Sequence, residues 1–432
     1  MIYDKKAECA SRSETEAVQS EKLIKIVRHA YDNLAYYRAK MDALNVKPDD
    51  IKSIADAYKL PFTTKEDLRD NYPFGTFAVP NKDIVRIHAS SGTTGKPKVL
   101  GYTKGDLEMW ADCTARCLAM SGVTEDDIIQ VAYGYGLFTG GLGAHAGAEK
   151  LGAMVLPMST GNTKKLITMM KDLGVTAIAC TPSYLLHIIE VLEESGEISG
   201  VKLKTAICGA EPWTENMRLE MEKRLHVRAH DIYGLTEMMG PGVACDCEYH
   251  KGLHICEDHF LAEIVDEKSL TPKSAGETGE LVFTTLSKYG VPLIRYRTRD
   301  LTSISYEKCE CGRTSARIAR FKGRSDDMLI IRGVNVFPSQ IESSLLEIEE
   351  ATAHYVITVD RINNMDTLEV QVELKEQSFS DEIRHLEAIN AKIAKNIQQT
   401  IGLAAKVKLV EPNSIERSFG KTCHVIDKRV LS

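Results

Sequence analysis

The sequence predicts an α/β fold in which a large N-terminal domain with mostly parallel sheets precedes a small α+β domain. In the first half of the chain, short apolar runs such as 128–132 and 177–180 alternate with helical stretches. This alternation is typical of a parallel sheet covered by helices on both faces. In the last hundred residues, apolar and polar positions alternate instead. We place the boundary in the charged segment 323–327, which gives a large domain, 1–325, and a small mobile domain, 326–432.

Capping signals and periodicity predict the individual elements. Ser13 with Glu16 three residues later has the form of a capping box that begins a helix, and Thr63 with Glu66 repeats this signal. Beyond about residue 240 the segments become shorter and more polar, as in an antiparallel meander. The other elements predicted by periodicity are strands at 84–89, 153–156, 280–285, 368–374 and 407–409, and a helix over 386–397.

Length, charge and composition exclude several classes of protein. The chain has 432 residues, enough for two or three domains, and its 54 basic and 61 acidic side chains leave a formal charge of −7. This mild acidity, without a block of Lys or Arg, argues against nucleic-acid binding and membrane-surface binding. No run of about 18 apolar residues is present, and the first residues lack the apolar stretch of a secretory signal. We therefore expect a cytoplasmic protein.

A segment dense in glycine, hydroxyl and lysine side chains follows the predicted strand 84–89. Residues 90–98 read SSGTTGKPK. The glycines permit a tight turn with consecutive N–H groups, and hydroxyls and lysines converge on the same concavity, as a di- or triphosphate requires. It is not a Walker A loop, because only two residues separate the glycines and a proline follows Lys96. A polar surface loop is the alternative, and the density of these side chains favours phosphate binding.

Five segments in order along the chain resemble motifs of the adenylate-forming superfamily, which includes acyl-CoA synthetases, peptide-synthetase adenylation domains and luciferases. The first is the phosphate loop, and the resemblance spans most of the chain. It implies a reaction in which ATP activates an acid as an acyl-adenylate. The other four motifs are 233–237 (YGLTE), 296–300 (YRTRD, with Arg299 where many members have glycine), 323–327 (GRSDD) followed by Arg332 and Gly333, and 418–421 (SFGK).

Within this superfamily, the chain most resembles the phenylacetate–CoA ligases. The resemblance rests on 133–141 (YGYGLFTGG), 257–260 (EDHF) and 332–338 (RGVNVFP). It implies conversion of an arylacetic acid, ATP and CoA to the thioester, AMP and diphosphate by a homodimer. Three alternatives stay open: a ligase for indoleacetate or another aryl acid, an enzyme of the same fold with another acceptor, such as coenzyme F390 synthetase, and a nucleotide-binding protein without ligase activity.

The chemistry of adenylate formation indicates roles for some of these residues. Carboxylate attack on the α-phosphate joins two anions, so the site must supply positive charge and Mg²⁺. Glu237 is a candidate Mg²⁺ ligand and Thr236 a candidate donor to phosphate, although a Thr-Glu pair can also begin a helix. Asp300 offers two oxygens to ribose hydroxyls. Its alternative role is a surface ion pair with Arg299.

Further assignments follow from the resemblance. It implies that Lys421 bridges the carboxylate and the α-phosphate during adenylation, with Asp326 as the hinge of the small domain, whereas a solvated surface lysine is the alternative. The loop 209–212 ends a predicted strand, where a parallel sheet places ligand-binding loops, and we assign it to the adenine. The residues assigned to the nucleotide cofactors are Ser90, Ser91, Gly92, Thr93, Thr94, Gly95, Lys98, Gly209, Ala210, Glu211, Pro212, Asp231, Tyr233, Gly234, Thr236, Asp300, Arg324, Arg332 and Gly333.

The segment 133–141 is the candidate pocket for the aromatic acid. Aromatic side chains interleaved with glycines leave room for a flat apolar ring. The alternative is that the aromatic side chains pack in the core. The residues assigned to the acid are Tyr133, Tyr135, Gly136, Phe138 and Gly141.

Eleven cysteines without an export signal are expected to be reduced, and two tight groups among them indicate zinc. Two short Cys-x-Cys segments, 245–247 and 309–311, are typical of a tetrahedral site, with reduced structural thiols as the alternative. Related sequences often pair a Cys-x6-His segment with the later cysteines, and Cys245 is the substitute for the histidine. The chosen ligands are Cys247, His254, Cys309 and Cys311, in a structural rather than catalytic site.

Overall fold

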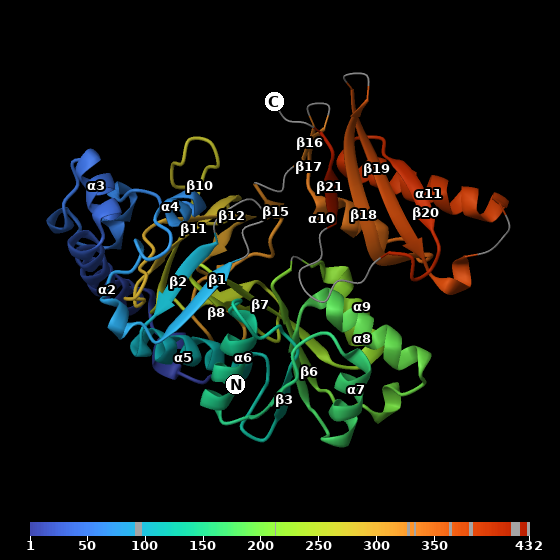
Figure 1. Cartoon of the computed structure of the whole chain (residues 1–432), viewed down its shortest axis with the longest axis horizontal. Helices are drawn as coiled ribbons and strands as arrows, with labels where there is room; N and C mark the ends of the chain where they lie inside the picture. Colours follow the sequence, from blue (N-terminus) through green and yellow to red (C-terminus); the bar gives the residue numbers. More distant parts are fainter. Residues whose placement is uncertain are drawn as a thin grey trace.

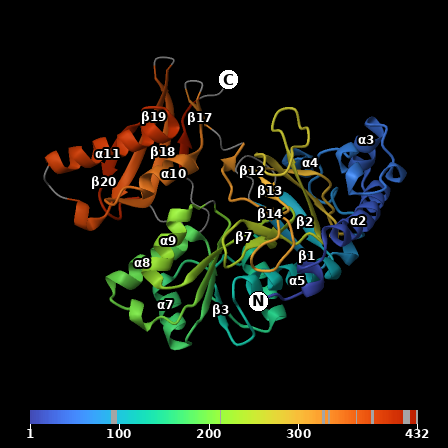
Figure 2. The ribbon, with the colours of Figure 1, turned by 180° about the vertical axis from the view of Figure 1, so that it is seen from behind.

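The computed structural model describes residues 1–90, 97–211, 213–325, 329–331, 334–362, 365–379, 383–415 and 424–429. It confirms the predicted α/β class: helices and sheets form a large body, and the C-terminal elements form a smaller unit beside it (Figure 1). Figure 2 shows from behind that the orange and red C-terminal unit stands above α8 (Pro182–Glu194) and α9 (Glu215–Leu225). Among the described residues, no helix is long and apolar enough to cross a membrane.

A nine-stranded sheet lies at the centre of the large body. Its order is β13-β14-β9-β8-β7-β6-β5-β3-β4. Neighbouring strands from β4 to β7 pair in parallel, and those beyond β7 pair antiparallel. The strands are β3 (Ile128–Val131), β4 (Met154–Pro157), β5 (Ala177–Cys180), β6 (Thr205–Gly209), β7 (Arg228–Leu235), β8 (Met239–Asp246), β9 (Leu253–Ile255), β13 (Ile304–Ser305) and β14 (Arg317–Ile318).

The parallel strands of this sheet are buried on both faces, as their apolar runs predict. Neighbouring residues of β5 enter two different cores: Ala177 packs in the core with Trp110 and Ala148, and Ile178 in the core with Leu185 and Met217. This alternation follows from the period of two residues along a strand. The helices of the first core are α5 (Lys104–Met120) and α6 (Gly140–Leu151), and those of the second are α7 (Thr163–Asp172), α8 and α9.

The two predicted N-terminal capping boxes lie one or two residues from their predicted positions. The helices of this region are α1 (Lys5–Glu8), α2 (Arg12–Asn33), α3 (Ala35–Ala43) and α4 (Lys65–Asp70). Helix α2 begins after Ser11 and not after Ser13, and α4 begins after Thr64 and not after Thr63. The Thr63 hydroxyl donates instead to the carbonyl of Ile294 at 2.6 Å. A tertiary hydrogen bond therefore uses the group that the local pattern assigned to the cap.

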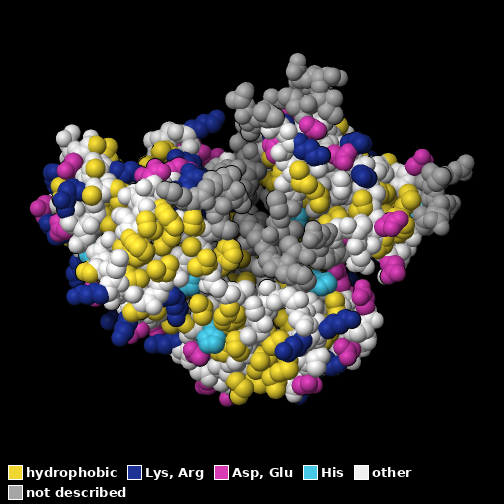
Figure 3. Space-filling view, viewed as in Figure 1, with side chains coloured by type: hydrophobic (Ala, Val, Ile, Leu, Met, Phe, Trp, Pro, Cys, Tyr) yellow, Lys and Arg dark blue, Asp and Glu magenta, His cyan; other side chains and the backbone are white. Residues whose placement is uncertain are grey.

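Smaller sheets complete the large body. The predicted strand 280–285 lies in the antiparallel sheet β10-β11-β12-β15, and a β1–β2 hairpin flanks the predicted phosphate loop. Hydrophobic side chains gather on the front of the molecule over this hairpin (Figure 3). Ile87 of β1 is an exposed hydrophobic residue. The strands are β1 (Arg86–Ser90), β2 (Lys98–Tyr102), β10 (Phe260–Val265), β11 (Gly279–Thr285), β12 (Tyr296–Thr302) and β15 (Gly323–Arg324).

The C-terminal unit has its own core and the strands and helix that periodicity predicts. Its main sheet has the order β20-β19-β18-β21. Its apolar cluster includes Ile357, Val370 and Ile393 and contains no described residue before Leu329. The boundary between residues 325 and 326 stays a prediction. The elements are β16 (Leu329–Ile331), β17 (Val334–Val336), α10 (Pro338–Leu346), β18 (Ala351–Ile362), β19 (Met365–Leu374), α11 (Ile383–Ile401), β20 (Lys406–Val410) and β21 (Val425–Asp427).

Candidate active site

A pocket opens between the carboxyl ends of β6 and β7 in the large body and the start of α10 in the small unit. It encloses about 900 Å³ of empty space, counting its open mouth. Ligand-binding loops of parallel sheets lie at this end of the strands. Most of the described residues that we predicted to bind the nucleotide line this pocket. The lining residues are Ala210, Glu211, Trp213, Asp231, Ile232, Tyr233, Gly234, Leu235, Asp300, Arg320, Phe321, Gly323, Arg324, Pro338 and Ser339.

Close packing of two strands brings the loop after β6 to the pocket. A Cβ atom on Gly209 would lie 2.2 Å from the carbonyl oxygen of Ile232 on β7. No side chain fits at that distance, so glycine is required where the loop leaves the sheet. Ala210 and Glu211 follow directly, and the Glu211 carboxylate accepts a hydrogen bond from the Ser183 hydroxyl at 2.7 Å.

The carboxylate of Asp300 on β12 is held between two donors. The Tyr233 hydroxyl donates to Oδ2 at 2.6 Å, and Nη1 of Arg324 donates to Oδ1 at 3.1 Å. Burial and the neighbouring Asp300 charge raise the pKa of Tyr233 well above its usual value. The alternative of an Arg299–Asp300 surface pair is wrong, because Asp300 is buried and Arg299 faces Glu280 at 3.6 Å. A carboxylate fixed in a pocket suits a diol such as ribose, because it offers two acceptor oxygens.

Glu237 lies in the turn between β7 and β8, beside Lys98 from β2. The Lys98 ammonium and a Glu237 carboxylate oxygen are 2.5 Å apart, and Glu237 is 7% exposed. Residues 236–238 form a turn that leads directly into β8, so the alternative of a helix start at Thr236 is wrong. The structure thus joins a predicted phosphate-binding lysine to the predicted Mg²⁺ ligand. A carboxylate oxygen near the phosphate loop is the donor type that Mg²⁺ prefers.

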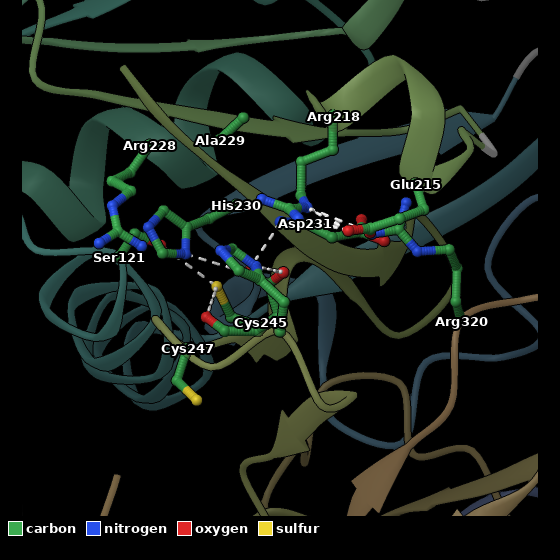
Figure 4. Close-up of polar contacts among 12 residues, drawn as sticks. Ser121, Glu215, Arg218, Arg228, Ala229, His230, Asp231, Cys245, Cys247 and Arg320 are labelled. Atoms are coloured by element: carbon green, nitrogen blue, oxygen red, sulfur yellow. Dashed lines mark hydrogen bonds and ion pairs between the residues drawn. The ribbon is translucent and has the colours of Figure 1, made fainter. Parts of the chain in front are cut away.

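Asp231, in the middle of β7, is a buried acid that lines the pocket. Burial and the charge of Asp246 raise the pKa of Asp231 to about 7. Figure 4 shows the polar groups around it, among them Arg320, whose guanidinium lies 5.2 Å from the centre of the Trp213 ring. Sequence reasoning missed Trp213 and Arg320. Trp213 directly follows the assigned loop 209–212, which was a usable signal, whereas nothing in the sequence around Arg320 indicates its position.

A second polar group, also absent from the sequence-based assignments, ties β7 to β8. Asp246 Oδ1 accepts hydrogen bonds from His230 Nδ1 and from the backbone N–H of Asp231, both at 3.0 Å, and His250 Nδ1 donates to Oδ2 at 2.7 Å. The two histidines hold the pKa of Asp246 below its usual value despite its burial. These bonds satisfy a buried carboxylate, and they fix the strand that carries Asp231.

The residues assigned to the aromatic acid occupy different environments. Tyr133 is 6% exposed and packs in the main core, and its hydroxyl has no hydrogen-bond partner among the described residues. Phe138 is 52% exposed. A Cβ on Gly141 would meet the Gly134 carbonyl at 2.7 Å, whereas one on Gly136 would meet nothing within 4 Å, although its φ of +153° favours glycine. The assignment of this segment to the acid stays a prediction.

The structure brings together the four side chains chosen as zinc ligands. The ligand atoms of Cys247, His254, Cys309 and Cys311 all lie within 4.8 Å of one another. The Sγ atoms of Cys247 and Cys309 are 3.7 Å apart, and Cys311 Sγ is 3.5 Å from His254 Nε2. A tetrahedral zinc with ordinary bond lengths requires about 3.8 Å and about 3.6 Å for these separations. The Ser315 hydroxyl lies 3.0 Å from His254 Nδ1 and orients the ring.

Cys245, the substitute ligand, lies elsewhere. Its thiol contacts the Ser121 hydroxyl at 3.4 Å and the carbonyl of Cys117 at 3.6 Å. It therefore points to helix α5 rather than to the four-residue group. The ligand set itself stays a prediction.

Several assigned residues lie outside the part of the chain that the structure describes. They belong to the phosphate loop, the adenine loop, the hinge and its following loop, and the C-terminal lysine motif. They are Ser91, Gly92, Thr93, Thr94, Gly95, Pro212, Asp326, Arg332, Gly333 and Lys421.

The pocket contains a carboxylate held by Tyr233 and Arg324, and a Lys98–Glu237 pair lies at the turn after β7. These features suit a protein that binds a nucleotide. The AMP-binding enzyme family matches residues 12–287, and the AMP-binding enzyme C-terminal domain matches residues 333–429. The chain belongs to the AMP-binding enzyme family.

Curated relatives match nearly the whole chain. The phenylacetate–coenzyme A ligase of Escherichia coli (strain K12) is 51% identical over 98% of this chain and 97% of its own length. That of Aromatoleum evansii is 50% identical over 98% of this chain and 96% of its own length.

Solved structures of 2-hydroxyisobutyryl-CoA ligase share the fold at 29% identity. The structure in the postadenylation state, in complex with R3-HIB-AMP, matches with a TM-score of 0.93 over 98% of this chain and 92% of that one. The structure of the same enzyme in the thioesterification state, with 2-HIB-AMP and CoA, matches over 98% of this chain and 91% of that one, but with a TM-score of 0.73. The arrangement of the two parts in this chain therefore resembles the postadenylation state.

Proposed function

We propose that this chain is a phenylacetate–CoA ligase that converts phenylacetate, ATP and CoA to phenylacetyl-CoA, AMP and diphosphate through an acyl-adenylate. The observation that carries the proposal is the match of the whole chain to ligases of that name at 45–51% identity. The pocket formed around Asp300 and Tyr233 supports it, because it offers a nucleotide site between the two parts of the chain.

In the first half-reaction, a phenylacetate oxygen attacks the α-phosphorus of ATP and diphosphate leaves. The chain must hold the nucleotide and stabilise the added charge. Asp300 accepts hydrogen bonds from the ribose hydroxyls, with Tyr233 and Arg324 holding the carboxylate in place. Asp231 also lines the pocket, and its pKa, raised to about 7 by burial and by the charge of Asp246, lowers the negative charge beside the nucleotide.

Positive charge at the phosphates comes from Lys98 and from Lys421 of the C-terminal motif. The Lys98 ammonium lies 2.5 Å from a carboxylate oxygen of Glu237. Glu237 would hold Mg²⁺, which when bound neutralises phosphate charge during the transfer. The Thr236 hydroxyl donates to a phosphate oxygen in this proposal.

In the second half-reaction, the CoA thiol attacks the acyl carbonyl and AMP leaves. We propose that the small unit turns about Asp326, withdraws Lys421 and brings Arg332 and Gly333 to the site. The TM-scores support this, because 2-hydroxyisobutyryl-CoA ligase has been solved in different arrangements, and this chain matches the postadenylation structure at 0.93 but the thioesterification structure at 0.73. Restricting the backbone at Asp326 should therefore impair one half-reaction more than the other.

The proposal extends to the state of the protein in the cell. One structural zinc per chain, held by Cys247, His254, Cys309 and Cys311, fits the distances between these side chains. A cytoplasmic homodimer, with the domain boundary near residue 325, is the expectation from the resemblance. Light scattering of the purified chain measures the oligomeric state.

The experiment that tests the function is an ATP–diphosphate exchange screen over carboxylic acids. Phenylacetate should support exchange, and an apolar aliphatic acid of similar length should support much less. Exchange with an aryl acid but no thioester on addition of CoA would identify an enzyme with another acceptor. No acid-dependent exchange would identify a nucleotide-binding protein without ligase activity.

A further inference from the structure

Lys288, in the loop between β11 and β12, is a fully buried lysine close to the predicted catalytic turn. Its side chain has 0% exposure. Its Nζ donates to the Glu237 carbonyl oxygen at 2.9 Å and lies 4.5 Å from the centre of the Tyr102 ring. Burial of a charged ammonium is costly unless specific contacts compensate for the lost water. An apolar side chain would fill this space at lower cost, but it would leave the Glu237 carbonyl without this donor.

The turn between β7 and β8 is held by side chains from two other segments. Besides the bond from Lys288, the Tyr102 hydroxyl donates to the Thr236 carbonyl at 3.4 Å. Lys98 reaches the Glu237 carboxylate at 2.5 Å. Two consecutive carbonyls and one carboxylate of the turn are thus fixed by donors from β2 and from the loop after β11. The orientation of the peptide after Thr236 depends on these donors.

The position of Lys288 is itself fixed by the start of helix α5. Asp106 accepts hydrogen bonds from the backbone N–H groups of Tyr289 at 2.7 Å and Gly290 at 3.0 Å. A Cβ on Gly290 would lie 2.7 Å from the Asp106 carboxylate and 2.8 Å from the Gly101 carbonyl. The loop that carries Lys288 therefore cannot shift without breaking these contacts. They hold the Lys288 ammonium at the Glu237 carbonyl.

Charge alone does not explain the location of this lysine. Burial lowers the pKa of Lys288 to about 7, while the charges of Asp106 and Glu237 act in the opposite direction. Among the residues that the structure describes, Lys288 forms no ion pair. Its direct hydrogen bond is to a backbone carbonyl. This hydrogen bond is directional, and it holds the backbone of the turn rather than a carboxylate side chain.

We propose that Lys288 is a positioning residue that fixes the Glu237 peptide, so that the Thr236 and Glu237 side chains face the reacting phosphates during adenylate formation. The inference rests on the proposed function and names a residue that acts through the backbone without touching a substrate. A displacement of about 1 Å in a reacting group can cost about 100-fold in rate. Loss of this donor should therefore affect the chemical step of adenylation more than binding.

The test compares Lys288→Met with Lys22→Met in the full-length chain. Lys22 is a matched control, because its Nζ also donates to a carbonyl, that of Asp258, and is partly buried on α2 away from the pocket. Lys288→Met should lower kcat of phenylacetate-dependent exchange about 10- to 100-fold. The KM for phenylacetate, the affinity for AMP measured without metal, and the rate of CoA attack on supplied phenylacetyl-adenylate should change less than about threefold. Lys22→Met should change none of these.

Tyr102→Phe provides a second variant that keeps the ring and removes only the donor to Thr236. It should lower the same kcat by a smaller factor and leave AMP affinity unchanged. Full exchange activity in Lys288→Met, or an equal loss in both half-reactions and in AMP affinity, would overturn the inference. If Lys288→Met does not fold, unchanged kcat in Tyr102→Phe overturns it. No exchange in the wild type would instead overturn the proposed function, and this inference with it.

Discussion

Replacing Asp300 by Asn tests the proposed ribose site, because it removes the charge and keeps the shape of the side chain. The carboxylate is placed by Tyr233 at 2.6 Å and Arg324 at 3.1 Å, so both oxygens have a defined direction. Hydrogen bonds to a charged group contribute about 1.5–3 kcal/mol each, and the amide retains only one acceptor. A loss of about 2–3 kcal/mol raises the Kd for AMP by about 30- to 150-fold.

Isothermal titration of AMP into the purified variant measures this change directly. The matched control is Glu280→Gln on β11, because Glu280 is a fully buried carboxylate that accepts from Arg297 at 2.6 Å and does not line the pocket. The control should lower the melting temperature and leave the Kd for AMP within about threefold of the wild type. A folded Asp300→Asn variant with nearly unchanged AMP affinity would refute the assignment of Asp300 to the ribose.

Three further predictions concern the metal group, a buried acid and a close strand contact. We expect metal analysis of the wild type to give one zinc per chain. Cys311→Ser should abolish this zinc and lower the melting temperature, whereas Cys245→Ser should retain the metal. Retained zinc in Cys311→Ser would contradict the ligand set. The pKa of Asp231 is raised to about 7 in the folded protein, so the wild type loses stability as pH rises from about 4 to 7. Asp231→Asn removes this titration and should therefore raise the melting temperature more at pH 8 than at pH 5. An equal change at both pH values would contradict this. Gly209→Ala should destabilise the protein by more than about 2 kcal/mol in chemical denaturation, since its Cβ would lie 2.2 Å from a backbone oxygen, and a neutral effect would contradict the geometry.

Local patterns predicted most of the fold because its strands are regular and strongly apolar or alternating. The runs at 128–132 and 177–180 became neighbouring strands of a parallel sheet, and the alternation at 368–374 became β19. The cap predicted at Thr63 was misplaced because the choice between neighbouring hydroxyls depends on distant partners. The Thr63 hydroxyl donates a hydrogen bond to the Ile294 carbonyl, so the helix is capped by Thr64 instead.

The site was predictable only as far as its residues lie in recognisable segments. Tyr233 and Asp300 are in motifs, and the structure joins them. Arg320 and Lys288 have no local signal, because their importance comes from contacts with segments far away in the sequence. The two cysteine groups were predictable as a metal site from their short spacings, although they lie about 60 residues apart, whereas the choice of His254 over Cys245 came from the resemblance to related sequences.

The most direct test of the proposed function is the identification of the products formed by the purified chain from phenylacetate, ATP, Mg²⁺ and CoA. Mass spectrometry should show phenylacetyl-CoA and AMP in equal amounts, with no product when phenylacetate is omitted. Formation of ADP in place of AMP would contradict the acyl-adenylate route. Absence of any aryl-acyl thioester, in a preparation that binds AMP, would contradict the ligase function.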